Sequence, residues 1–88
     1  MHEMSIALEV CRIAAEHAVA AGPGAKSVVA VGVDVGDAAG VELSSLTFCL
    51  ESLLAGPPFA GAKPVIHRAS GDVLRVSYVE VEDGRPND

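Results

Sequence analysis

Two clusters of glycine and proline divide this chain and limit what it can fold into. Gly22-Pro23-Gly24 and Gly56-Pro57-Pro58 interrupt any helix or central strand, because proline lacks a backbone N–H and glycine favours turns. The residues before the first cluster have a helical repeat, and a strand pattern follows it. Every regular element is therefore short, and a chain of 88 residues has room for one small domain.

Two segments have the repeat of an amphipathic helix. In the first, polar residues recur at spacings of four, three and four and form one stripe: Ser5, Glu9, Arg12 and Glu16. In the second, leucines hold the same repeat: Leu43, Leu46, Leu50, Leu53 and Leu54. We predict helices from Met4 to Ala20 and from Glu42 to Ala55. Phe59, in the connector after the second helix, is expected to enter the core.

Three other segments alternate as strands do. From Ser27 to Val35, four valines at alternate positions share one face: Val29, Val31, Val33 and Val35. Lys63–Arg68 and Val73–Val81 are predicted to be the second and third strands, with Gly36–Gly40 a loop. The four residues from Ala69 to Asp72, with a central glycine, are expected to join these two strands as a tight hairpin.

The order helix, strand, helix, strand, strand favours an α+β fold, with two helices packed on one face of a small three-stranded sheet. Residues 1–82 would form this domain, and the charged tail 83–88 is expected to fray. Half of the residues are hydrophobic, but only three are aromatic, so the core consists of small aliphatic side chains. Such a core can depend on a partner chain, and an uncovered strand edge makes a homodimer plausible.

Charge and hydropathy narrow the function. A net charge of -6 argues against a surface for nucleic acid or for an anionic membrane. No stretch approaches the roughly 20 apolar residues of a spanning helix, and none resembles a signal peptide, so we expect a cytoplasmic protein. Cys11 and Cys49 belong to no C-x-x-C pair, which leaves no zinc or redox motif. Both are expected to be buried free thiols.

No catalytic constellation is apparent. The acidic groups Asp34/Asp37 and Glu80/Glu82/Asp83 have no nucleophile or phosphate-binding loop nearby, and a solvated acidic face is the better interpretation. His17 and His67 are expected to be surface residues. We therefore predict that the protein is not an enzyme.

The first three residues, Met1-His2-Glu3, have the chemistry of a terminal metal chelate. The Met1 amine, the His2 backbone nitrogen and the His2 imidazole can close consecutive small rings around one ion. Such a nitrogen set is planar, which suits Ni(II) or Cu(II) and does not suit tetrahedral Zn(II). Glu3 would supply a fourth ligand through its carboxylate or backbone nitrogen. The alternative is that His2 belongs to a solvated terminus.

The chain resembles the HypA family of nickel metallochaperones, which serve maturation of nickel-iron hydrogenases and, in some organisms, urease. The resemblance spans three main motifs: Met1-His2-Glu3-Met4-Ser5, Leu46-Thr47-Phe48-Cys49-Leu50-Glu51, and Gly71-Asp72-Val73-Leu74-Arg75-Val76. It implies Ni(II) bound by Met1, His2 and Glu3. It also implies two partners, the maturation GTPase HypB and the hydrogenase large subunit.

One departure from the family pattern is large. The family normally inserts a zinc domain with two C-x-x-C pairs between the last two strands, where this chain has only Ala69-Ser70-Gly71-Asp72. No cysteine follows Cys49, so a four-thiolate zinc site cannot form within the chain and no zinc is expected. The chain therefore resembles a truncated form that lacks the zinc domain.

Two other functions remain open at this point. The chain could be a metal-independent interaction module that pairs with a full-length HypA or with the maturation GTPase. It could also regulate an enzyme through a small-molecule pocket. The leading hypothesis is a nickel-binding accessory protein that delivers Ni(II) for maturation of nickel-iron hydrogenase.

Overall fold

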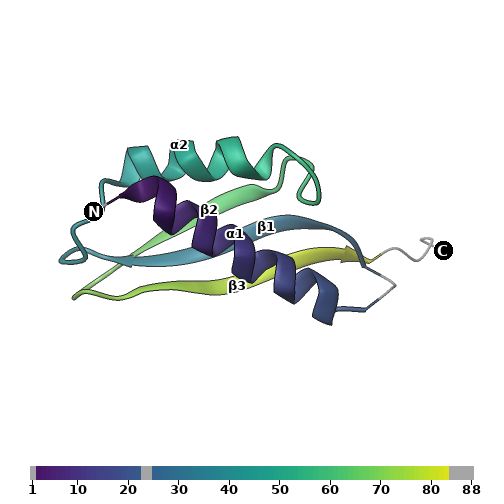
Figure 1. Ribbon diagram of the computed structural model, residues 1–88. Coiled ribbons are helices and arrows are strands. Elements are labelled where there is room, and N and C mark those ends of the chain that lie inside the picture. The colour runs from purple at the N-terminus through teal and green to yellow at the C-terminus, as the bar shows by residue number, and fades with distance from the viewer. Residues whose placement is uncertain (1, 23–24, 84–88) are drawn as a thin grey trace.

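The computed structural model describes residues 2–22 and 25–83 as two layers (Figure 1). The elements are α1 (Glu3–Ala20), β1 (Ala25–Gly36), α2 (Leu43–Leu54), β2 (Lys63–Ala69) and β3 (Leu74–Asp83). Both helices lie on the same side of the three-stranded sheet. The predicted α+β class and element order are confirmed, with boundaries that differ by one or two residues. The tail 83–88 was predicted to fray. Asp83 is the last residue of β3, and residues 84–88 lie outside the described part.

The strand order is β2-β1-β3, so the expected hairpin between β2 and β3 is wrong. β1 pairs in parallel with β2, from Ala30 opposite Lys63 to Gly36 opposite Ala69. β1 also pairs antiparallel with β3 along its other edge. A parallel pair needs a long crossover, and α2 lies on the connection between β1 and β2. β3 therefore returns on the free edge of β1, which becomes the central strand.

The short link between β2 and β3 crosses over the end of β1. Three backbone N–H groups near that end donate to carbonyls on or beside the link: Gly36 to Val73 at 2.7 Å, Asp37 to Ala69 at 2.9 Å and Ala38 to Gly71 at 2.8 Å. A Cβ atom on Gly36 would overlap the carbonyl of Gly71. Glycine at position 36 is thus what lets the link pass so close.

The predicted alternation of β1 is interrupted by a bulge. The register with β3 shifts between Val28 and Ala30, where β1 contains one residue more than β3. Val28 is 1% exposed whereas Val29 is 36% exposed, so Val29 does not share the buried face of Val31 as predicted. A bulge inserts one residue and moves later side chains to the opposite face, which the valine spacing alone does not indicate.

The core lies between the helices and the sheet. Leu46, Leu50 and Leu54 of α2 are fully buried, and Phe59 is 7% exposed, as predicted. On α1 the innermost residues are small, with Ala7 and Ala14 fully buried. The predicted polar stripe of α1 is exposed and is joined by an Arg12–Glu16 ion pair of 2.6 Å.

The two thiols differ in environment. Cys11 is buried, and its burial raises the pKa of the thiol. Cys49 is free as predicted but only partly buried. Among the described residues, no helix is long and apolar enough to cross a membrane.

Candidate metal centre

His2 occupies the position just before α1 begins. Its backbone is extended (φ -86°, ψ 102°), and its carbonyl accepts the first helical hydrogen bond, from Ile6 N at 3.3 Å. The imidazole is exposed and caps no backbone group. The first N–H groups of a helix have no intrahelical acceptor. The backbone nitrogens of His2 and Glu3 can therefore bind a metal without loss of a helical hydrogen bond. Met1 lies outside the described residues.

Glu3 begins α1 and is tied to the start of α2. Its Oε2 accepts a hydrogen bond from the backbone N–H of Glu42 at 3.0 Å. This bond is the main cause that lowers the pKa of Glu3, followed by the N–H of Glu3 itself. The carboxylate is thus charged and already held at neutral pH. If it served as the fourth metal ligand, it would compete with the Glu42 contact, whereas the backbone nitrogen of Glu3 would not.

Glu42 is the residue of this region that the sequence prediction missed. It caps α2, because its carboxylate accepts from Ser45 N at 2.6 Å and from the Ser44 hydroxyl at 2.7 Å. The serine hydroxyl and backbone groups lower the pKa of Glu42 to about 2. The start of the leucine repeat marked a helix N-terminus here, but nothing local indicated contact with Glu3. The structure therefore adds a second charged carboxylate beside the candidate site.

The N-terminal ends of α1 and α2 lie at the same end of the molecule (Figure 1). The N–H groups at a helix start carry partial positive charge, which favours the carboxylates of Glu3 and Glu42 there. Among the described residues, no group of three or more His, Cys, Asp or Glu could hold a metal ion. The chelate predicted from the sequence is of another kind, since it combines the Met1 amine and backbone nitrogens with the single imidazole of His2.

The other two histidines lie away from His2. His17 is exposed in the last turn of α1, roughly 21 Å along the helix axis from Glu3. His67 is exposed on β2, with Nδ1 3.6 Å from Oδ1 of Asp34. Both were predicted to be surface residues, and neither joins the candidate site.

Of the predicted solvated acidic residues, Asp37 is exposed as expected, whereas Asp34 is not. The side chain of Asp34 is only 17% exposed, and its Oδ2 accepts from Arg75 Nε at 2.9 Å. Asp37 accepts from the backbone N–H of Gly71 at 3.1 Å and so supports the link over β1. Strand pairing brings these partners together from distant parts of the sequence. Glu80 and Glu82 are exposed, as predicted.

We compared the sequence with known protein families. The family described as hydrogenase/urease nickel incorporation, metallochaperone, hypA, matches residues 1–81. The chain belongs to the HypA family. This HypA match includes the N-terminal tripeptide, both helices, and the short link between β2 and β3.

Curated relatives agree with this assignment. The chain is 37% identical over 71 residues to a hydrogenase maturation factor HypA of Geobacter metallireducens, an alignment covering 81% of this chain and 60% of that protein. It is 38% identical over 71 residues to HypA of Chlorobaculum tepidum, covering 81% and 61%. With HypA of Desulfosudis oleivorans the identity is 41% over 66 residues, covering 75% and 56%. The chain thus matches about three fifths of the length of these relatives.

Proposed function

We propose that this HypA-family chain binds Ni(II) as cargo at its first three residues and delivers it in the cytoplasm for maturation of a nickel-iron hydrogenase. The observation that carries the proposal is the exposed His2 at the start of α1, in a family of nickel-incorporation proteins. Carriage and release of an ion need no catalytic group, so the protein acts as a non-enzyme.

The proposed ligands are the Met1 amine, the His2 backbone nitrogen, the His2 imidazole, and the backbone nitrogen or carboxylate of Glu3. The amine and imidazole nitrogens must be free of their added proton to bind, and each backbone nitrogen releases its proton to the solvent as the metal coordinates. Nickel affinity is therefore expected to fall as the pH is lowered. Cu(II) binds such a set more tightly on intrinsic affinity, so selectivity would come from metal supply and from the partner that receives the ion.

The proposed partners are the maturation GTPase HypB and the hydrogenase large subunit. An ion held at an exposed helix start is open to a receiving protein, and its release disturbs no core contact. Both properties suit transfer better than storage.

The test is a nickel titration of the chain with a free N-terminus, followed by calorimetry and by the absorption of planar Ni(II). His2→Ala is expected to lose most of the affinity, and acetylation of the amine or insertion of one glycine after Met1 should do the same. His17→Ala is the matched control, since it removes an exposed imidazole from the other end of α1. Equal affinity of wild type and His2→Ala would end the proposal.

A second candidate function is a metal-independent interaction module that pairs with a full-length HypA or with the GTPase. It is favoured by the sheet, in which both β2 and β3 lie at an edge. Binding of the purified GTPase in the presence of a metal chelator, equal for wild type and His2→Ala, would favour this function over nickel delivery.

A further inference from the structure

β3 forms one edge of the sheet and is the longer of the two edge strands. It spans Leu74–Asp83 and pairs only with β1 among the described residues. The N–H and C=O groups on its outer side can therefore pair with another strand. A partner that adds a strand here would extend the sheet without any change of fold.

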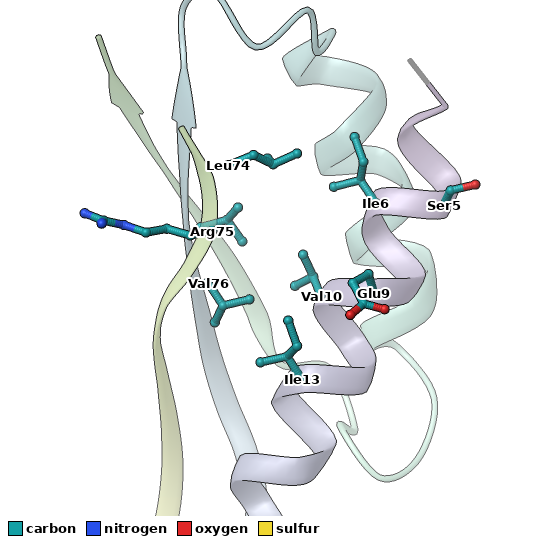
Figure 2. Close-up of a pocket in the computed structure, with 9 residues that line it drawn as sticks. Ser5, Ile6, Glu9, Val10, Ile13, Leu74, Arg75 and Val76 are labelled. Carbon is teal, nitrogen blue, oxygen red and sulfur yellow. The ribbon is translucent and has the colours of Figure 1, made fainter. Parts of the chain in front are cut away.

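An apolar groove runs beside this edge. It has a volume of about 290 Å³ and lies between α1 and β3. Ile6, Val10 and Ile13 point across it toward Leu74 and Val76 (Figure 2). The open backbone edge and open apolar surface thus lie together, which is the arrangement that a pairing strand with apolar side chains would cover.

We propose that the occupant of this edge is a second copy of the chain, paired β3 to β3 in antiparallel orientation about a two-fold axis between Ser77 and Tyr78. In this register Leu74 faces Val81 of the second copy, and Val76 faces Val79. These four side chains pack against the core on the helix side, so apolar pairs would meet beside the groove.

A bulge in β3 selects this register. Tyr78 pairs with Gly32 and Val76 pairs with Val33, which leaves Ser77 without a partner in β1. Val76 and Val79 consequently lie on the same face although they are three residues apart. In a regular strand, two residues three apart point to opposite faces. The proposed register is therefore the one that keeps apolar residues opposite apolar residues from Leu74 to Val81.

The charges on the opposite face are self-complementary in the same register. Arg75 of each copy would face Glu80 of the other, and both residues are exposed. Arg75 uses its Nε for the bond to Asp34, and its terminal nitrogens remain available for a second carboxylate. One dimer would contain two such pairs, because a two-fold axis repeats every contact.

Sedimentation equilibrium of wild type, Arg75→Glu and Glu80→Lys, alone and in an equimolar mixture, tests the proposal. The wild type should dimerise reversibly. Each variant alone places like charges opposite each other twice, and its dimer dissociation constant should rise about tenfold or more. The mixture should recover wild-type affinity, because each altered residue then faces an opposite charge. Glu51→Lys, on the exposed side of α2, makes the same charge change and should leave dimerisation unchanged.

A wild type that stays monomeric at every concentration would overturn the proposal, and so would a mixture no tighter than its components. Arg75→Glu also places a carboxylate beside Asp34, so circular dichroism must show that this variant is folded. If it is not, amide exchange of the wild type decides. Exchange along β3 should slow as protein concentration rises, and protection that is independent of concentration would mean that the chain covers its own edge.

Discussion

Two glycines mark the places where the backbone or a side chain of another strand passes closest to β1. A Cβ at Gly36 would overlap backbone atoms of the link between β2 and β3. A Cβ at Gly32 would overlap the ring of Tyr78 and would lie 2.8 Å from Ser77 Oγ. The ring of Tyr78 can rotate away, but the hydrogen-bonded link at Gly36 cannot, so Gly36 is the more demanding position.

We expect Gly36→Ala to lower the free energy of unfolding by about 1–3 kcal/mol, because a methyl group forced against fixed backbone displaces it. Urea unfolding measures the change. Gly56→Ala is the control, since a Cβ there has no neighbour within 4 Å. Equal stability of the two variants would contradict the close contact.

Single-residue roles were predictable where they follow from the residue's own neighbours in sequence. The buried leucines of α2 and the burial of Phe59 were predicted correctly from periodicity and from the connector. The ion pair of Asp34 and the contact between Glu3 and Glu42 were not. Both join residues about forty positions apart, and a single sequence does not show which polar residues strand pairing brings together.

At the scale of the element, α2 has one buried face and one exposed face. Leu50 is fully buried, whereas Phe48 is 68% exposed although its ring is larger. Burial, not size, sets the contribution of each residue to stability. Leu50→Ala should therefore lower the free energy of unfolding by about 2–5 kcal/mol, whereas Phe48→Ala should stay within about 0.5 kcal/mol. Denaturant unfolding checks both, and a larger loss for Phe48→Ala would contradict the position of the helix.

The cap of α2 gives a prediction for pH. The pKa of Glu42 is lowered to about 2 in the folded protein from an ordinary value of 4.5, so the folded state favours the charged form. Its contribution is fully present above the ordinary pKa and is lost as the pH falls toward 2. Glu42→Gln should thus be less stable than wild type at neutral pH, and the difference should shrink between about pH 5 and pH 2.

Urea unfolding across that range measures the difference. Glu51→Gln, an exposed carboxylate on the same helix, should show no comparable narrowing. A Glu42→Gln difference that is constant with pH would contradict the cap.

Elements were predicted better than their pairing. Helix and strand periods are local, and all five elements were found within one or two residues. The hairpin prediction was wrong because a four-residue link can join two adjacent strands and can also cross the end of a third strand that lies between them. The parallel pairing of β1 with β2 decides between them, and that pairing joins distant residues, such as Gly36 and Ala69, for which the sequence has no local signal.

The whole molecule is held by one apolar layer between the helices and the sheet. The largest fully buried side chains are leucines and valines: Leu46, Leu50, Leu54, Val28, Val31 and Val33. We expect a zinc chelator to leave the melting temperature unchanged, because this layer needs no metal and the chain has only two cysteines. Thermal unfolding with and without the chelator measures this. A lower melting temperature in its presence would reveal a structural zinc that the fold does not predict.

The strand order also sets what can be spliced into this scaffold. β2 ends and β3 begins on either side of β1, so the two ends of the link are about two strand spacings, or roughly 10 Å, apart. Any module grafted between residues 69 and 74 must begin and finish across such a gap. An inserted domain whose two ends lie that far apart could be gained or lost during evolution without breaking the strand pairing of the sheet.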